Sequence, residues 1–206
     1  MTDIEILNKN LQKKFEEEQN YYNLERYVMS EILSPIEDYI NAIDIIRNNI
    51  NLNKGLNLYY IAAYLSAEWI PSSNEFLDTL NSMIDIVDDM DKAIIYYLNA
   101  YSLSWSMKNW RKCEKYRLYL LKSIQYSKKK HFVNNRFDLA KVLQGKDTLK
   151  YMNEAMENIE KVETIETLKN KSINYWLSSQ RFIDEFILGT HLSQEVYLYK
   201  FNSIME

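Results

Sequence analysis

Apolar side chains recur every three or four positions along most of the chain, which is the period of an α-helix. A half-buried strand would instead alternate apolar and polar residues at every second position. Three runs show the helical period: Ile94, Leu98, Tyr101 and Trp105; Trp110, Cys113, Tyr116, Leu120 and Ile124; and Leu149, Met152, Met156 and Ile159. The pattern therefore predicts an all-α protein.

Capping signals and breaks divide this pattern into helices. Ser34, Pro35 and Glu37 form a helix start, because the Ser oxygen accepts from an unpaired N–H and Pro suits the first helical position. Ser72–Glu75 repeats the signal just after Pro71. The first predicted helix, 3–33, could instead be two helices, because its apolar phase drifts around the acidic run 16–18. The predicted helices lie near 3–33, 35–50, 56–69, 73–88, 91–107, 110–128, 132–144, 147–162, 165–187 and 192–204.

The composition agrees with this prediction. The chain has 206 residues, of which 47% are apolar, so it can build a sizeable core in one domain or in one domain with an arm. Only 3 Gly and 2 Pro occur, too few for the many turns of a sandwich or barrel.

From residue 56 onward the predicted helices come in pairs with short joints. The pairs begin near 56, 91, 132 and 167, at a spacing close to the tetratricopeptide period of about 34 residues. We therefore predict an N-terminal helical arm or cap over 1–54 and a helical-repeat domain over 55–206, in which antiparallel helix pairs stack as a tetratricopeptide-like array. The alternative is an irregular α-helical bundle.

The sequence lacks the residues of the common catalytic and metal sites. Cys113 is the only cysteine, which excludes an internal disulfide framework and a Cys-based zinc site, and His131 and His191 are the only histidines. No Gly-rich nucleotide-binding or nucleophile motif occurs. No apolar run approaches the ~18 residues that span a bilayer. We therefore expect a cytoplasmic, non-enzymatic protein with no cofactor and no metal.

Charge is distributed unevenly. Residues 1–107 carry 7 Lys+Arg against 17 Asp+Glu, whereas residues 108–150 carry 13 against 3. This basic stretch is a candidate electrostatic patch that docks an acidic protein surface or holds phosphates, and a solvated loop is the alternative. Its candidate residues are Lys128, Lys129, Lys130, Arg136, Lys141 and Lys146.

Polar rows at helical spacing mark a second kind of candidate site. In a helical-repeat array the first helix of each pair lines the concave side, and an amide there can pair with the backbone of an extended peptide. Ordinary solvent-facing positions are the alternative. The candidate peptide or partner contacts are Asn99, Ser102, Asn134, Asp138, Asn170, Asn174 and Arg181.

Three segments together carry a family resemblance: Tyr97–Tyr116, Leu149–Ile159 and Leu168–Trp176. On these segments the region from about 91 to 187 resembles the tetratricopeptide-like portion of bacterial and phage peptide-sensing regulators, including the arbitrium receptors. Members of that family bind a short peptide in the concave groove, often through Asn side chains. The resemblance implies Asn99, Asn134 and Asn174 as peptide contacts.

The N-terminal region departs from that family. Regulators that bind DNA carry a helix-turn-helix, and residues 1–50 are too acidic and too long between breaks for a typical one. The resemblance then implies a stand-alone sensor or adaptor. Toxin-neutralising immunity proteins and phage-encoded inhibitors are comparable all-helical classes.

The leading hypothesis is a module that binds a protein or short peptide and acts by occlusion or scaffolding. A nucleic-acid-binding accessory protein that uses the stretch 128–150 is the less favoured alternative. We also expect a homodimer through the N-terminal helix, and no membrane partner.

Overall fold

The computed structural model describes residues 3–32, 39–52, 74–127, 132–157, 187–189, 199, 202 and 204, and within them it contains helices and turns and no strand. This confirms the all-α prediction for the described residues. The chain divides into two compact units, 1–88 and 89–206. The predicted boundary between residues 54 and 55 lies outside the described residues, as does the predicted helix 56–69.

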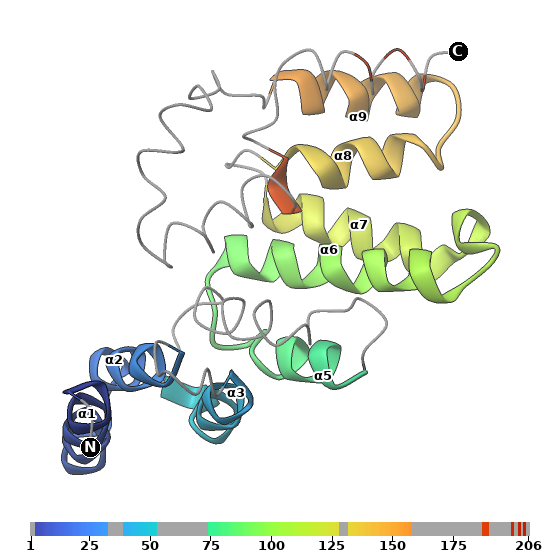
Figure 1. Cartoon of the computed structure of the whole chain (residues 1–206). Coiled ribbons are helices and arrows are strands. Elements are labelled where there is room, and N and C mark those ends of the chain that lie inside the picture. The colour runs from blue at the N-terminus through green and yellow to red at the C-terminus, as the bar shows by residue number, and fades with distance from the viewer. Residues whose placement is uncertain are drawn as a thin grey trace. The chain divides into compact units, whose positions relative to one another are not determined.

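The first unit is built from short helices (Figure 1). Helix α1 packs against α2, and α2 packs against α3. Its core contains Leu24, Val28 and Ile46, none of which is exposed. The elements are α1 (Asp3–Glu17), α2 (Tyr21–Ile32), α3 (Tyr39–Asn48), the 3₁₀ turn η1 (Ile50–Leu52) and α5 (Asn74–Ser82).

The N-terminal helix predicted over 3–33 is two helices, as the alternative interpretation had it. Helix α1 ends at Glu17, inside the acidic run 16–18 around which the apolar phase drifts. Asn20 then caps α2, because its Oδ1 accepts from the backbone N–H of Asn23 at 2.9 Å. A single long arm is therefore wrong, and a homodimer through this region stays a prediction.

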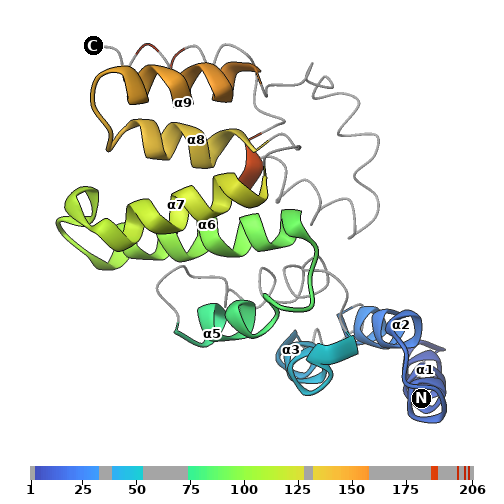
Figure 2. The same ribbon diagram turned by 180° about the vertical axis from the view of Figure 1, so that it is seen from behind.

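The second unit is a series of helices in which each packs against the next in chain order (Figures 1 and 2). Its core includes Leu120 from α7 and the rings of Phe132 and Phe137, all of them almost completely buried. Stacking as a tetratricopeptide-like array stays a prediction. The elements are α6 (Asp89–Ser106), the 3₁₀ turn η2 (Trp110–Lys112), α7 (Glu114–Tyr126), α8 (Val133–Ala140) and α9 (Lys146–Glu157).

Two predicted helices of this unit are shorter than expected. The helix predicted over 110–128 begins as η2, and Cys113 then adopts an extended backbone before α7 starts. The helix predicted over 132–144 ends at Ala140, and Gly145 has a positive φ of 66° that permits the turn into α9. Cys113 is accordingly half-buried at the start of α7 and does not lie inside a helix, as the predicted helix 110–128 would have it.

A pair of leucines on α7 tests this core. Leu120 is 0% exposed and Leu118 is 51% exposed. Leu120→Ala should lower the free energy of unfolding by about 2–5 kcal/mol, because it leaves a cavity. Leu118→Ala should change it by less than about 0.5 kcal/mol. Urea denaturation followed by circular dichroism measures both, and equal losses would contradict this arrangement of α7.

Candidate functional site

Three tyrosine rings from α6 and α7 form a connected cluster in the second unit. The rings of Tyr96 and Tyr126 stack, with centroids 5.7 Å apart and an interplanar angle of 10°. The ring of Tyr119 also lies near that of Tyr96, with centroids 6.4 Å apart and an interplanar angle of 33°. The cluster therefore joins the two helices along one side of the α6–α7 pair.

Lysines surround this cluster. Each of three ammonium groups lies over one ring: Lys122 over Tyr96 at 5.0 Å, Lys92 over Tyr126 at 5.6 Å, and Lys115 over Tyr119 at 5.6 Å from the ring centroid. Such cation–π contacts contribute about 0.5–1 kcal/mol at exposed sites. We call these six residues the lysine–tyrosine surface: Lys92, Tyr96, Lys115, Tyr119, Lys122 and Tyr126.

The lysine–tyrosine surface carries uncompensated positive charge. Asp89 lies 4.0 Å from the Lys92 ammonium, as an i,i+3 neighbour on α6. Among the residues that the structure describes, no carboxylate pairs with Lys115 or Lys122, both of which are exposed. These two ammonium groups are thus available to an anionic partner.

Leucines lie beside the lysines on the outward side of α7. Leu118 is 51% exposed and Leu121 is 42% exposed, whereas Leu120 between them is buried. Positions three or four apart share one side of a helix, so Leu118 is a neighbour of both Lys115 and Lys122 along α7. The outward side of α7 therefore combines apolar and cationic groups.

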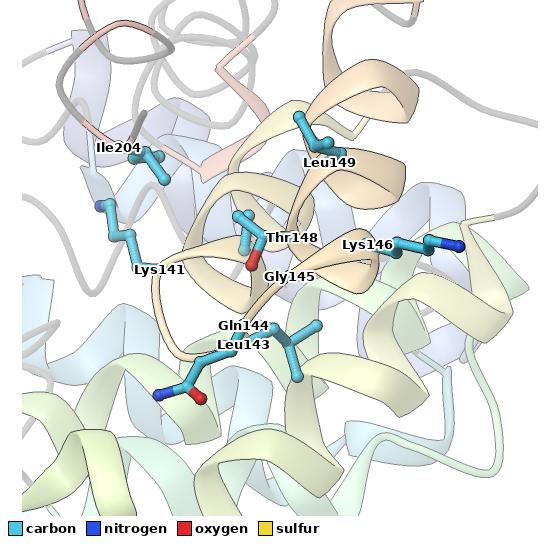
Figure 3. A pocket seen from close by; sticks show the side chains of 9 residues that line it. Lys141, Leu143, Gln144, Gly145, Lys146, Thr148, Leu149 and Ile204 are labelled. Carbon is cyan, nitrogen blue, oxygen red and sulfur yellow. The ribbon is translucent and has the colours of Figure 1, made fainter. Parts of the chain in front are cut away.

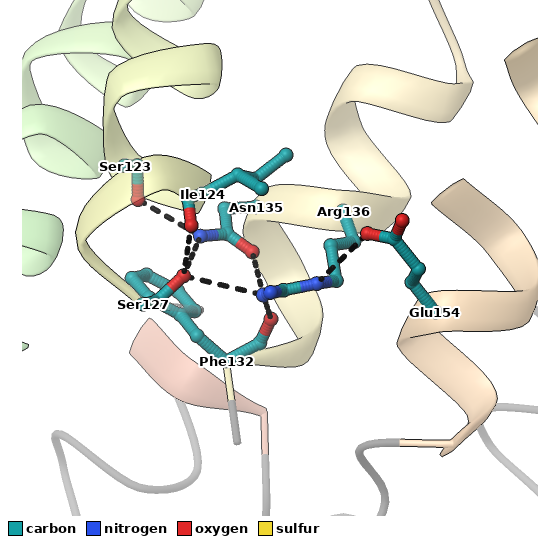
Figure 4. Close-up of polar contacts among 7 residues, drawn as sticks. All are labelled: Ser123, Ile124, Ser127, Phe132, Asn135, Arg136 and Glu154. Atoms are coloured by element: carbon teal, nitrogen blue, oxygen red, sulfur yellow. Dashed lines mark hydrogen bonds and ion pairs between the residues drawn. The ribbon is translucent and has the colours of Figure 1, made fainter. Parts of the chain in front are cut away.

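The inward side of α7 is fixed by a buried polar network (Figure 4). Asn135 of α8 donates from Nδ2 to Ser123 Oγ at 2.9 Å and to Ser127 Oγ at 3.1 Å. Ser123 Oγ in turn donates to the carbonyl of Ala93 on α6 at 2.7 Å. One amide thus links α8 to α7, and through Ser123 to α6.

Arg136 extends this network to α9. Its Nη1 donates to the Phe132 carbonyl at 2.7 Å and to Ser127 Oγ at 3.2 Å, and its Nε lies 3.6 Å from Glu154 Oε2 of α9 (Figure 4). Ser127 and Phe132 flank residues 128–131, so one guanidinium holds the positions at both ends of that segment. The tetrapeptide itself, with Lys128, Lys129 and Lys130, lies outside the described residues.

Burial dominates the electrostatics of this network. Arg136 is 3% exposed, and burial lowers the pKa of its guanidinium, an effect that Glu154 opposes. Its Nε has no hydrogen bond within the described part of the chain, and the ion pair with Glu154 is its main compensation. The sequence placed Arg136 in an electrostatic patch, and this is wrong, because the side chain is buried and its Nη1 donates to Ser127 and Phe132 inside the unit.

A second, partly buried link joins α6 to α8. Tyr97 donates its hydroxyl to Asp138 Oδ2 at 2.9 Å, and Lys141 Nζ lies 2.9 Å from Oδ1 of the same carboxylate. Burial, and then the Asp138 carboxylate, raises the pKa of Tyr97 well above its ordinary value of 10.0. Asp138 therefore acts in the described structure as a link between helices.

The predicted groove amides are also engaged within the unit. Asn99 donates to the Ile95 carbonyl at 2.9 Å, and Asn134 donates to the Ile187 carbonyl at 3.0 Å. Both residues and Ser102 are buried, which corrects the expectation that they line an open surface. Helix packing covers them, and their role as peptide contacts stays a prediction. Asn170, Asn174 and Arg181 lie outside the described residues.

The remaining predicted lysines lie near a pocket at the turn between α8 and α9 (Figure 3). Lys141 and Lys146 are exposed at its rim, and its volume is about 540 Å³. Thr148 Oγ1 is buried without a hydrogen-bond partner among the described atoms. Two exposed lysines and one amide select no particular ligand. The pocket is lined by Ala140, Lys141, Leu143, Gln144, Gly145, Lys146, Thr148, Leu149 and Ile204.

Comparisons with known proteins identify no relative. No family model, no curated protein and no solved structure matches the chain. Within the described ranges, no group of three or more His, Cys, Asp and Glu side chains is placed to hold a metal ion. None of the helices in those ranges is both long and apolar enough to cross a membrane.

The sequence reasoning missed the lysine–tyrosine surface. Its signal is the spacing of Lys115, Tyr119, Lys122 and Tyr126, which places a lysine or a tyrosine at every turn of one side of α7. The prediction for 128–150 depends on the three consecutive lysines at 128–130, whereas the lysine–tyrosine surface lies mainly on the preceding helix, α7.

Alkaline pH tests the buried Tyr97. Because its folded pKa is raised, the protonated phenol stabilises the fold below about pH 10, and this contribution is lost as the pH rises further. The free energy of unfolding should fall as the pH rises above about 10, and Tyr97→Phe should make that fall shallower. Urea denaturation across this range measures it, with the exposed Tyr199→Phe as control. An unchanged slope in Tyr97→Phe would contradict the burial.

Proposed function

We propose that this chain is a non-enzymatic module that binds a protein or peptide through the outward side of α6 and α7. The observation that carries the proposal is the lysine–tyrosine surface beside the exposed Leu118 and Leu121. Aromatic residues are enriched at the energetic centres of protein interfaces, and apolar side chains left on an ordered helix gain free energy when a partner covers them.

The location differs from the groove that the sequence suggested. The amides of Asn99 and Asn134 already donate to backbone carbonyls, so a peptide would have to replace those bonds. A partner that binds to the outward side of α7 would not have to replace internal hydrogen bonds. Its side chains are exposed, while its opposite side is held by the network around Asn135 and Arg136.

Binding by such a surface suits occlusion or scaffolding. A partner held on α7 is covered over part of its own surface, with no chemical step required. This mode of action agrees with a regulator or inhibitor of the bacterial or phage kind that the sequence resembles, and equally with a toxin-neutralising immunity protein. The choice among these classes depends on the partner's identity.

Single-stranded nucleic acid is the second candidate partner. Lysines interleaved with tyrosines are the side chains that such partners use, and three further lysines follow Tyr126 within four residues in the sequence. The exposed leucines argue for the protein partner, because they gain little beside phosphates.

An affinity capture from lysate of the native host tests the proposal. With nuclease present, the full chain should retain one protein partner. Leu118→Ser with Leu121→Ser should lose it, because both side chains are exposed on α7 beside the lysine–tyrosine surface. Leu149→Ser alters an exposed leucine on α9 and should retain it. Recovery of only nuclease-sensitive material, or equal recovery by all variants, would contradict the proposal.

A further inference from the structure

The exposed side of α7 has a regular chemical pattern. Lys115, Leu118 and Lys122 follow one another at steps of three and four, and Leu121 lies on the adjacent row. All four are exposed. A helix that presents leucines flanked by charges resembles one helix of a coiled coil. In a coiled coil the apolar residues of the two helices meet, and the flanking charges select the partner.

Each charge on this side contacts a tyrosine ring. Lys115 and Lys122 rest over the rings of Tyr119 and Tyr96, and the Tyr96 ring is itself stacked on Tyr126. A lysine that is already restricted loses less conformational freedom when it pairs with a carboxylate. The lysine–tyrosine surface is therefore better organised for ion pairing than a row of free lysines.

The same contacts disfavour nucleic-acid bases. A base needs a free ring face on which to stack. Tyr96 is contacted by the stacked ring of Tyr126 and by the Lys122 ammonium, and Tyr126 also has Lys92 over its ring. The surface thus offers cations and leucines more readily than ring faces. Such a surface is complementary to an acidic, partly apolar partner.

On these grounds we propose that the outward side of α7 docks an acidic amphipathic helix of a partner protein. Its apolar residues would cover Leu118 and Leu121, and its Asp or Glu side chains would pair with Lys115 and Lys122. This inference rests on the proposed binding function and adds the class of partner. Charge complementarity supports it, because no described carboxylate neutralises either lysine.

Fluorescence anisotropy with a defined probe tests this inference on the full chain. The probe is a labelled peptide of about three heptads with leucine at the core positions and glutamate at the flanking positions. A matched peptide with lysine at the flanking positions, and a labelled oligothymidine of about 20 nucleotides, are run beside it. Sedimentation velocity of the unlabelled chain shows whether a second copy occupies the surface instead.

Charge reversal distinguishes binding at this surface from a general attraction between the acidic peptide and the lysines of the chain. Lys115→Glu with Lys122→Glu should weaken binding of the glutamate peptide at least about tenfold at low salt, and less at high salt, because screening removes the ionic part. Lys108→Glu with Lys146→Glu makes the same change in net charge at exposed positions off this side of α7 and should stay within about twofold.

Four outcomes would overturn the inference. These are no saturable binding of the glutamate peptide, equal losses in the two charge-reversed variants, tighter binding of oligothymidine, and self-association that Lys115→Glu with Lys122→Glu abolishes. The lysate capture is judged separately. If the double leucine variant loses its partner there while the glutamate peptide fails to bind, the binding function stands and the acidic helix is wrong.

Discussion

A buried guanidinium needs partners, and Arg136 obtains them from three helices. It is 3% exposed, and it donates to Ser127 and Phe132 while pairing with Glu154. Removal of one member of such a group leaves a buried polar atom without compensation, which costs several kcal/mol. Because its partners lie at the end of α7, at the start of α8 and on α9, Arg136 fixes the relation of these helices. The polar core of the second unit therefore depends on this residue.

That constraint determines what α7 presents to solvent. Its inward side is committed to Asn135 and to the carbonyl of Ala93 through Ser123, so the helix cannot rotate to bury Leu118 without breaking these bonds. The leucines and the lysines over the tyrosine rings are left outside together. A surface that is held from within loses little conformational freedom when a partner covers it.

The sequence predicted the helices better than the site, for physical reasons. Apolar periodicity reports which side of a helix is buried, and it located α6 and α7 to within a few residues. It does not distinguish a polar residue in solvent from one satisfied inside, so Asn99, Asn134 and Arg136 were expected on a surface and are buried with internal partners. The shorter helices arise from backbone features, such as the positive φ of Gly145, whose effect depends on the turn actually formed.

Site-specific photo-crosslinking in the native host tests the central claim most directly, because it reports which position of the folded chain touches a partner. A photoreactive amino acid would replace Leu118 on α7 or, as the matched control, the exposed Leu149 on α9. The account predicts a crosslink to one acidic protein from position 118, mapped to a helix that carries Asp or Glu, and none to that protein from position 149. A crosslink from 149 alone, or RNA as the product at 118, would contradict it.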